Sequence, residues 1–377
     1  MFTNLSKSAI LTLVTECNFH SKKALGSIFS FFSGSGFLDL GFESEGFRVE
    51  LVNEYNTDFL KAYQYNREKF KIKPPKYGHH LCSVEEFLSN SIFSEQVKAS
   101  KSKGLVGFIG GPPCPDFSVA GKQAGRHGEN GKLSRTYIDI ILQEKPDWFL
   151  FENVKGLYRT AKHRAFFDEL KHDLLNAGYS MAERLVNALE YGAPQHRERI
   201  ILIGFSESLR SKLGLPEGEI GEQQFPWKKY AQRDASFLIK NKEQTPRDQT
   251  VQYWFELNKV TEHPNNRGFV PRAALSKFLT IQEGDDSRKS GKRLHRNQFS
   301  PTACYGNNEV HIHPTEPRRI TVAEALAIQT LPKEFSFPDD MSLSSMFKTI
   351  GNGVPFILAK GLAKTLKSML ASLSNEP

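Results

Sequence analysis

A cysteine set between rigid residues is the feature of this sequence with the clearest chemical potential. Residues 110–118 read GGPPCPDFS and follow residues 105–109, an apolar run typical of a buried strand. The glycines permit a sharp turn and the prolines fix φ, so the loop would hold the Cys114 thiol at a fixed point. A thiolate is a nucleophile whose geometry governs its rate. By itself, the loop fits either a reactive cysteine or a tight turn with a buried one.

A carboxylate follows a second apolar run. Residues 148–151 read WFLF and predict a buried strand, and Glu152, Asn153 and Val154 come directly after it. In open α/β sheets the carboxyl ends of the strands share one edge, where such folds bind ligands. We therefore expect Glu152 to lie at the same edge as Cys114.

The chain resembles the DNA cytosine-5 methyltransferases, in particular bacterial enzymes of restriction-modification systems. The resemblance extends over most of the chain through motifs in the family's order: Phe32-Ser33-Gly34-Ser35-Gly36, Pro113-Cys114, Glu152-Asn153-Val154, Gln195-His196-Arg197-Glu198-Arg199 and Gly351-Asn352-Gly353-Val354-Pro355. It implies an S-adenosylmethionine-dependent enzyme, without a metal, that methylates C5 of a cytosine in a short, specific sequence of double-stranded DNA.

The resemblance also implies catalytic roles. Cys114 would add to C6 of a flipped-out cytosine, which makes C5 nucleophilic. Glu152 would hydrogen-bond N3 and the amino group of the base, and the N3 contact requires a protonated carboxyl. Arg197 and Arg199 alternate along a strand, would share a face, and would hold O2 of the base and neighbouring acidic or phosphate groups.

The motif residues also have structural interpretations. For the two arginines the alternative is an ion pair with Glu152 or Glu198. Asn153 and Gln195 are expected to orient the reacting groups rather than to react themselves.

A glycine turn after the first predicted strand indicates a cofactor site. Gly34 and Gly36 allow a ligand to approach the backbone closely. A dinucleotide fingerprint would need glycine at position 39, where Asp39 stands, so a nicotinamide enzyme is disfavoured. By resemblance this turn binds the methionine part of S-adenosylmethionine. The family form is FxGxGG, and here Phe37 replaces the last glycine, which would alter the packing of the turn without removing the site.

The remaining cofactor residues follow in chain order. Glu54 comes roughly 20 residues after the glycine turn, where an acidic residue accepts from ribose hydroxyls. Tyr55 stands where the family stacks an aromatic ring on adenine; its alternative is core packing. Ser83 replaces the family's adenine-binding Asp and is a weaker acceptor, for which Glu85 or Glu86 would substitute. The full expected set is Phe32, Gly34, Gly36, Glu54, Tyr55, Ser83, Pro113 and Asn352.

Composition sets broad limits. The chain has 377 residues, 50 Lys and Arg against 42 Asp and Glu, and a net charge of +8, which fits a polyanionic partner. The cysteines Cys17, Cys82, Cys114 and Cys304 are scattered without a CxxC, so neither a disulfide framework nor a zinc site is indicated. We expect a reducing bacterial cytoplasm, with nucleoid association when bound to DNA. The short apolar run at residues 10–14 predicts neither a signal peptide nor a membrane span.

The apolar runs predict the elements that position these residues. Strands are expected at 27–32, 48–53, 105–109, 147–151 and 199–205, with helices between them, such as one ending near Gly178. This is a doubly wound α/β pattern with a Rossmann-like sheet. We divide the chain into a catalytic domain (1–205), a target-recognition domain (206–315) and a segment that returns to the catalytic domain (316–377).

Residues 206–315 lack clean periodicity, and we expect them to form an irregular, β-rich insertion. The alternative is a disordered insertion, against which stand apolar residues that could form a small core: Phe225, Trp227, Tyr253, Trp254, Phe255, Phe269, Phe278 and Leu279. A helix is expected at 321–330, with a Thr321 and Glu324 capping box. A last helix at 356–373 carries leucines on one face and should pack on the first domain.

Two regions are expected to contact DNA. The glycine-rich, basic stretch 119–135, with Gln123 and Arg126, could close over DNA; the alternative is a mobile surface loop. In the recognition region, the candidates for base or phosphate contacts are Arg267, Arg272, Lys277, Arg288, Lys289, Lys292, Arg293 and Arg296. The alternative for each is a solvated charge.

The sequence leaves several functional alternatives open. A solitary methyltransferase fits the residues as well as one with a cognate restriction endonuclease, and in either case we expect a monomer. An RNA (tRNA) cytosine-5 methyltransferase is disfavoured by the sizeable recognition region. A catalytically silent DNA-binding relative is disfavoured by the intact catalytic motifs, and a cysteine hydrolase would need a histidine partner for Cys114 that is not evident.

Overall fold

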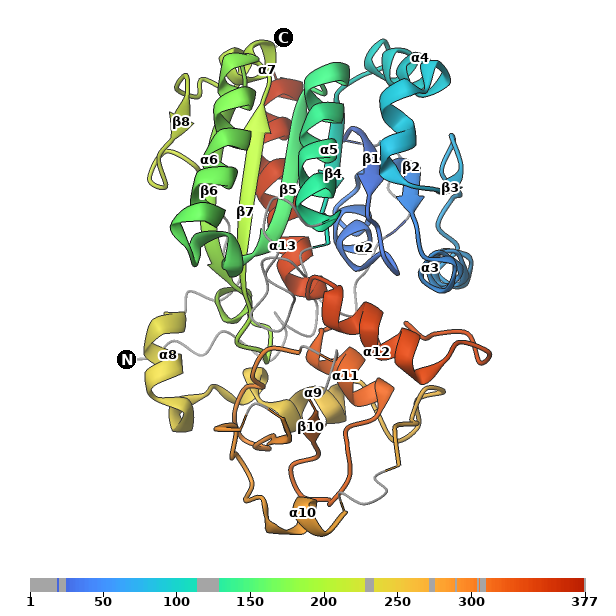
Figure 1. The fold of residues 1–377 in the computed structure, drawn as a ribbon, viewed down its shortest axis with the longest axis vertical. Coiled ribbons are helices and arrows are strands. Elements are labelled where there is room, and N and C mark those ends of the chain that lie inside the picture. Colours follow the sequence, from blue (N-terminus) through green and yellow to red (C-terminus); the bar gives the residue numbers. More distant parts are fainter. Residues whose placement is uncertain are drawn as a thin grey trace.

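The chain folds around one large sheet. The structure, a computed structural model, describes residues 19, 25–113, 129–227, 234–270, 275–288, 290–303, 305 and 310–375. In Figure 1 the sheet and its flanking helices occupy the upper part, and short helices and extended segments occupy the lower part.

Eight described strands form the sheet in the order β3-β2-β1-β4-β5-β7-β6-β8. From β3 to β5 all neighbours run parallel, whereas β7 is antiparallel to both β5 and β6. Every expected strand forms, but the one expected at 199–205 is antiparallel, and β3, β6 and β8 were not predicted. The bounds are β1 Ser27–Phe31, β2 Arg48–Glu54, β3 His79–Leu81, β4 Val106–Gly110, β5 Trp148–Val154, β6 Ser180–Asn187, β7 Glu198–Phe205 and β8 Glu219–Ile220.

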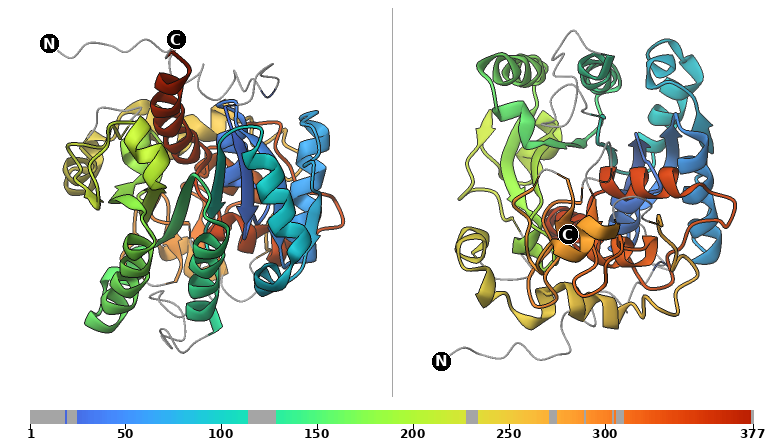
Figure 2. Two further views of the ribbon diagram at one scale, coloured as in Figure 1. Left: turned by 90° about the horizontal axis from the view of Figure 1, so that it is seen from above. Right: turned by 60° about the horizontal axis from the view of Figure 1, so that its bottom comes forward.

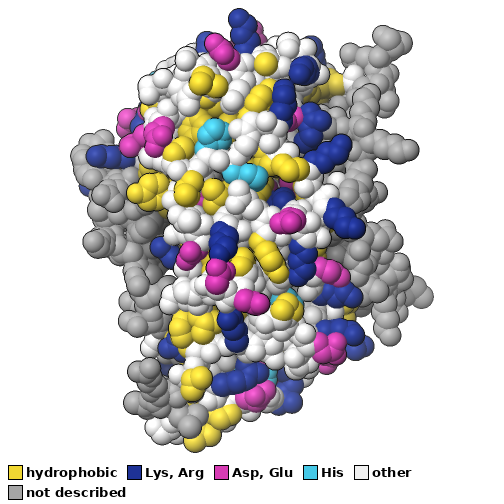
Figure 3. Space-filling view, turned by 90° about the vertical axis from the view of Figure 1, so that its right-hand side faces the viewer, with side chains coloured by type: hydrophobic (Ala, Val, Ile, Leu, Met, Phe, Trp, Pro, Cys, Tyr) yellow, Lys and Arg dark blue, Asp and Glu magenta, His cyan; other side chains and the backbone are white. Residues whose placement is uncertain are grey.

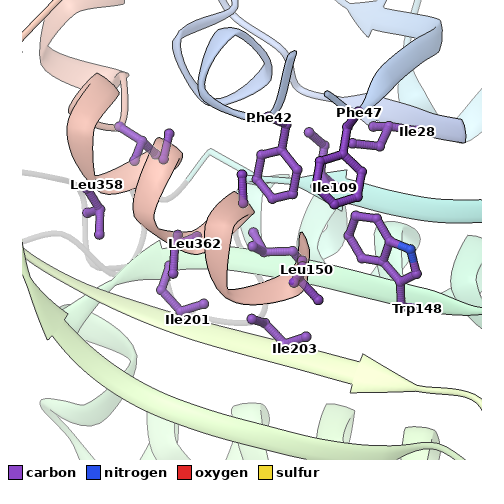
Figure 4. Close-up of a cluster of buried hydrophobic side chains, with 14 of the residues drawn as sticks. Ile28, Phe42, Phe47, Ile109, Trp148, Leu150, Ile201, Ile203, Leu358 and Leu362 are labelled. Carbon is purple, nitrogen blue, oxygen red and sulfur yellow. The ribbon is translucent and has the colours of Figure 1, made fainter. Parts of the chain in front are cut away.

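Successive strand residues point to opposite faces of the sheet and enter two different cores. Phe29 and Phe108 pack on one face, under helices α4 (Ser91–Lys101), α5 (Glu129–Glu144) and α6 (Ala161–Asn176). Their chain neighbours Ile28 and Ile109 pack on the other face, with helices α2 (Phe37–Glu43), α3 (Thr57–Lys69) and α13 (Phe356–Leu370). Figure 2 shows the sheet between its helices, and Figure 4 shows the second core, where Leu362 of α13 lies over Ile201 of the sheet. Both faces are covered, as the continuous apolar runs predicted.

The predicted helix ends and caps agree with the structure. Helix α6 ends at Asn176, and Gly178 takes a left-handed φ of 89° just beyond it. Helix α11 (Val322–Ile328) begins with the expected capping box between Thr321 and Glu324. Helix α13 ends at Leu370, three residues before the expected end, and packs against α2 and the sheet. No helix in the described ranges is long and apolar enough to cross a membrane.

The expectation of a β-rich region at 206–315 is wrong for the described residues. They contain helices α7 (Glu207–Lys212), α8 (Ala235–Lys240), α9 (Val251–Leu257) and α10 (Leu275–Thr280). Strands are limited to β8, which extends the main sheet, and the two-residue pair β9 (Lys292–Arg293) and β10 (His311–Ile312). Polar residues cap two of these helices, since Asp234 and Thr250 accept hydrogen bonds from the first turns of α8 and α9.

The aromatic residues of this region do not form one separate core. Phe225 and Trp227 pack against the core of the main sheet. Tyr253, Trp254, Phe255 and Phe269 join a core that also contains residues of α2, α3, α11 and α12 (Leu343–Asn352). Phe278 lies in a small cluster, and Leu279 is exposed. The short 3₁₀ segments are η1 Val84–Ser89, η3 Lys155–Tyr158, η4 Ala188–Tyr191, η5 Lys242–Gln244, η6 Arg247–Gln249 and η7 Ala371–Asn375.

Truncation of a buried leucine tests the packing of α13 on the sheet. Leu362 of α13 is fully buried in the core between this helix and the sheet. We expect Leu362→Ala to lower the free energy of unfolding by about 2–5 kcal/mol, because it removes apolar contacts and leaves a cavity. The matched control is Ile92→Ala in α4, where the side chain is 64% exposed and the expected change is within about 0.5 kcal/mol. Equal effects of the two substitutions in urea denaturation would contradict the packing.

Candidate active site

At the carboxyl edge of β4 and β5, the loop that leads to Cys114 approaches Glu152. Gly111 follows β4, and a Cβ atom built on it would lie 2.8 Å from Oε2 of Glu152 in β5. Glycine at this position therefore allows the backbone of the proline loop to approach the carboxylate. The Asn153 amide donates a long hydrogen bond of 3.5 Å to the Pro112 carbonyl, consistent with its expected orienting role. Cys114 lies outside the described residues, directly after the half-buried Pro113.

Glu152 and Arg199 form an ion pair at this edge. Nε of Arg199 lies 2.8 Å from Oε1 of Glu152, and both residues are less than 9% exposed. The Arg199 guanidinium also donates to the Glu198 carbonyl over 2.7 Å. The ion pair that the sequence offered as an alternative is thus present. It also gives Arg199 the means to hold the carboxylate in place, because opposite charges attract strongly in a buried setting; the contact does not have hydrogen-bond geometry.

Arg197 lies apart from this pair. It is fully buried, and its two terminal nitrogens donate to the carbonyls of Ala303 (3.1 Å) and Gly351 (2.9 Å). The expectation that Arg197 holds the substrate directly is therefore not supported by its placement. Its contacts make it a positioning residue that connects the start of β7 to two later segments of the chain.

Two buried amides extend this connection. Gln195 accepts from the Ala303 N–H (3.1 Å) and donates to the Ile328 carbonyl and to Oε1 of Gln329 (both 3.4 Å). Gln329 donates in turn to the Ile350 carbonyl over 2.6 Å. Gln195 was expected to orient its neighbours, but Gln329 was missed. The available signal was a glutamine directly after the apolar run 325–328 and close to Leu331, which marks a side chain that must find a buried partner.

The glycine turn has the conformation that its sequence predicts. Gly34 and Gly36 take left-handed φ values of 57° and 81°, and Phe32 is also left-handed at 54°. Of the described residues, only Thr349 would come within 4 Å of a Cβ on Gly34, through its hydroxyl at 3.7 Å, so the described part of the chain leaves this side of the turn open. Phe37, the departure from the family pattern, is buried as the first residue of α2.

Phe37 is accommodated by a glycine far along the chain. A Cβ atom built on Gly353 would lie 2.3 Å from the Phe37 ring, and Phe335 packs edge-on against the same ring. The Phe37 ring is therefore accommodated in space that the absence of a side chain at Gly353 leaves free.

Glu54 closes the turn from the end of β2. Its Oε2 accepts from the Gly34 N–H (2.7 Å) and its Oε1 from the Asn56 N–H (2.8 Å). Burial raises the pKa of Glu54, and these two backbone donors oppose that rise. A carboxylate has four acceptor positions, so Glu54 retains capacity to accept from hydroxyl groups of a ligand. The next residue, Tyr55, is 78% exposed, which contradicts the alternative of core packing and leaves its ring available for stacking.

Ser83 serves mainly as a helix cap. Its hydroxyl accepts from the Glu85 N–H, and Glu86 reaches back to the Ser83 N–H over 3.2 Å, completing a capping box for η1. Glu86 also lines a cavity of about 300 Å³ that includes His80 and Cys82. Glu85, the other suggested substitute, lines a different cavity of about 390 Å³ together with Lys132 and Arg135. Asn352, the last residue of α12, is exposed.

The turn, Glu54 and Tyr55 together suit a ligand with hydroxyl groups and an aromatic ring. The open side of Gly34 gives backbone access, the Glu54 carboxylate gives acceptors, and the exposed ring of Tyr55 gives a stacking surface. The hydroxyls of Ser35 and Thr349 share a hydrogen bond of 2.9 Å, which ties the turn to α12. Within the described ranges, no cluster of His, Cys, Asp and Glu is suited to hold a metal ion.

The predicted DNA-binding residues fall into two groups. Gln123, Arg126 and Arg272 lie outside the described residues. Arg267 donates to the Asp339 carbonyl (2.9 Å), and Arg293 donates to the carbonyls of Ile281 (2.9 Å) and Glu316 (3.0 Å). These two side chains therefore already stabilise the chain itself.

Other basic residues remain candidates. Arg296 forms a two-pronged ion pair with Glu283, with a shortest distance of 2.9 Å, whereas the partly exposed Lys292 has no side-chain hydrogen bond to the part of the chain that the structure describes. Figure 3 shows the side where α3 and β3 lie in Figure 1, and its basic and acidic side chains are interspersed. The described part of that face therefore does not present a surface of one charge.

Comparisons with known proteins agree on one family. The family described as C-5 cytosine-specific DNA methylase matches residues 26–368. The chain is 54% identical to Type II methyltransferase M.NmeDI of Neisseria meningitidis serogroup C, over 93% of this chain and 84% of that protein. It is 30% identical to Type II methyltransferase M.FnuDI of Fusobacterium nucleatum, over 91% of this chain and 94% of that protein.

Solved structures show the same fold. A putative DNA modification methyltransferase encoded within an Escherichia coli prophage superposes with a TM-score of 0.66 at 24% identity, covering 92% of this chain and 99% of that chain. The Dnmt2 methyltransferase of S. pombe gives a TM-score of 0.59 at 12% identity, and the match covers 93% of this chain and 99% of that chain. These likenesses establish the α/β fold.

Removal of the Gln329 amide tests the buried connection. We expect Gln329→Leu to lower the free energy of unfolding by about 1–3 kcal/mol, because the Ile350 carbonyl loses its 2.6 Å donor in a buried setting. The control is Gln252→Leu, which removes an exposed 3.0 Å bond to Glu256 within α9 and should change stability by less than about 0.5 kcal/mol. An equally small change for both variants in urea denaturation would contradict the role of Gln329.

Proposed function

Because the chain belongs to the C-5 cytosine-specific DNA methylase family, we propose that it methylates C5 of a cytosine in a short, specific sequence of duplex DNA. We further propose that it is the methyltransferase of a Type II restriction-modification system and protects host DNA from a cognate endonuclease. The high identity to a Type II methyltransferase over most of both chains supports this role. Such an enzyme would act as a monomer in the bacterial cytoplasm and meet the nucleoid when bound to DNA.

One observation carries the proposal. The Glu152–Arg199 pair lies beside the loop backbone at Gly111, and Cys114 comes three positions later in the chain. A nucleophile and a buried, oriented carboxyl at one sheet edge are the two groups that addition to cytosine requires.

The reaction follows from the chemistry of the base. The Cys114 thiolate forms a bond to C6, which breaks the aromaticity of the ring and makes C5 electron-rich. Glu152 takes up a proton from solvent as the base binds; the protonated acid hydrogen-bonds N3 and relieves the negative charge that builds there, while Arg199 holds the carboxyl in place. C5 then forms a bond to the transferred methyl group and loses its proton to solvent. Departure of the Cys114 sulfur from C6 restores the aromatic ring.

The cofactor that fits the glycine turn is S-adenosylmethionine, which supplies an electrophilic methyl group when bound. Gly34 and Gly36 would admit its methionine part against the backbone, Glu54 would accept from the ribose hydroxyls, and Tyr55 would stack on adenine. Asn352 would close the site from the end of α12.

The target base must leave the duplex, because C6 cannot be reached by a side chain while the base is stacked. Flipping costs a few kcal/mol, and contacts to the displaced strand and the phosphates must offset that cost. Basic residues of the 119–135 stretch and Lys292 are the proposed contacts. Shape and hydrogen bonding within 206–315 would select the sequence.

Loss of the Cys114 thiol tests reaction, base and site together. In bisulfite sequencing of DNA from expressing cells, we expect wild-type protein to give 5-methylcytosine in one short motif and Cys114→Ser to give none. The variant should keep its DNA and S-adenosylmethionine affinities. Methylation by Cys114→Ser would exclude Cys114 as the nucleophile. Absence of 5-methylcytosine with folded wild-type protein would instead favour an RNA substrate or a silent DNA-binding protein.

Substitution of Arg199 tests the orientation of the carboxyl. Arg199→Met leaves Glu152 buried without its 2.8 Å partner, so we expect kcat to fall by about 10²–10³-fold with little change in cofactor affinity. The control is Lys155→Met, which breaks an exposed 2.9 Å ion pair with Glu198 and should leave kcat nearly unchanged. Steady-state methylation assays on matched DNA decide between these outcomes, and near-wild-type kcat for Arg199→Met would refute the orienting role.

A further inference from the structure

A buried cluster of charged side chains lies directly beneath the glycine turn. Asp39 and Glu43 belong to α2, and Tyr63 and Arg67 belong to α3. All four are less than 9% exposed. Since isolated buried charges are costly, their mutual contacts must fix one arrangement of these two helices.

Arg67 connects this cluster to the backbone of the turn. Its Nη2 donates to the Gly36 carbonyl (3.0 Å) and to Oε2 of Glu43 (2.7 Å). Its guanidinium carbon lies 3.8 Å from the centre of the Tyr63 ring, in a cation–π contact. One nitrogen thus holds a carbonyl of the turn and a carboxylate of the following helix at the same time.

The guanidinium also fills the space next to Gly36. A Cβ atom on Gly36 would lie 2.3 Å from Nη1 of Arg67 and 2.6 Å from the Tyr63 ring. Gly36 has a left-handed φ of 81°, and its N–H donates to the Ser33 carbonyl over 2.9 Å. The conformation of the turn and the position of the guanidinium therefore depend on each other.

Asp39 secures the cluster to the first strand. Its two carboxylate oxygens accept from the hydroxyls of Ser30 in β1 (2.8 Å) and Tyr63 in α3 (2.9 Å). The strand before the turn and the two helices around it are thereby joined through one side chain. The turn is held from below by side chains and not only by its own backbone bonds.

Burial of the two carboxyl groups and attraction by Arg67 have opposite effects on the pKa values in the cluster. Burial raises the pKa of Asp39, and burial also raises that of Glu43, to about 7, while Arg67 opposes both shifts. His79 of β3 stacks edge-on against Tyr63, and burial and then Arg67 lower the pKa of its ring. Arg67 is the cation that compensates the two carboxylates, so its removal would leave them buried together.

From this geometry we infer that Arg67 is a positioning residue for cofactor binding. It fixes the Gly36 carbonyl, and through it the Ser33–Gly36 turn against which the methionine part of S-adenosylmethionine would bind. The inference rests on the proposed function. Arg67 touches no reacting group, so its effect should appear in cofactor affinity and not in the chemical step.

Calorimetric titration of S-adenosylmethionine into the full-length protein tests this role. Arg67→Met should weaken binding about tenfold or more, since the turn loses its buried donor. At saturating cofactor, kcat should stay close to wild type. Arg67→Lys can reach one of the two acceptors but lacks the planar fork, so it should fall between wild type and Arg67→Met.

A matched control separates positioning from general stability. Arg184 lies on β6, away from the turn, and is also buried. It pairs with Glu190 (2.8 Å) and Glu222 (3.1 Å). Arg184→Met should lower the melting temperature and leave cofactor affinity unchanged. Equal losses of affinity in both variants would overturn the inference, because they would reflect general destabilisation.

The remaining outcomes are also decisive. Wild-type affinity in folded Arg67→Met would overturn the inference and leave the proposed function intact. If Arg67→Met does not fold, Arg67→Lys decides in the same way, and unchanged affinity would overturn it. If wild-type protein does not bind S-adenosylmethionine, the proposed function and the inference fail together.

Discussion

Arg197 is held by segments that lie 106 and 154 residues farther along the chain. A fully buried guanidinium is stable only where its N–H groups find acceptors in the protein, because burial removes their hydrogen bonds to water. Those acceptors are the carbonyls of Ala303 and Gly351, and the amides of Gln195 and Gln329 continue the connection to α11 and α12. The hydrogen bonds that a few buried side chains require therefore determine how the later segments pack against the sheet.

The antiparallel direction of β7 places the second arginine. A parallel strand here would begin at the opposite edge of the sheet, away from the ends of β4 and β5. Because β7 runs the other way, Arg199 pairs in register with Val154 and its side chain reaches Glu152. Arg197, two residues earlier, is then at the boundary where the later segments pack. One strand thus supplies both a contact to the proposed catalytic carboxyl and an anchor for the lower part of the molecule.

The glycine turn also depends on contacts with residues far along the chain. Phe37 stands where the family has glycine, and the space it needs is provided by Gly353 in the last motif. The core beneath α2 and α3 also contains Trp254 and Phe255 of the recognition region, together with α11 and α12. The cofactor turn and the proposed recognition elements are therefore parts of one packed unit. A displacement of either part would shift the other, since well-packed cores transmit strain.

The sequence by itself determined the α/β class, five of the strands, the caps at Thr321 and Gly178 and the shared edge of Gly111 and Glu152, because apolar runs, turn glycines and capping residues act over short distances. The helices of 206–315 were missed because each spans only six or seven residues, too few for a helical periodicity to show in the sequence. Only the tertiary structure decided the direction of β7, the exposure of Tyr55 and the separation of Arg197 from Arg199. These depend on which distant groups satisfy a buried donor or fill a buried space, and the spacing of residues along one chain does not specify that choice.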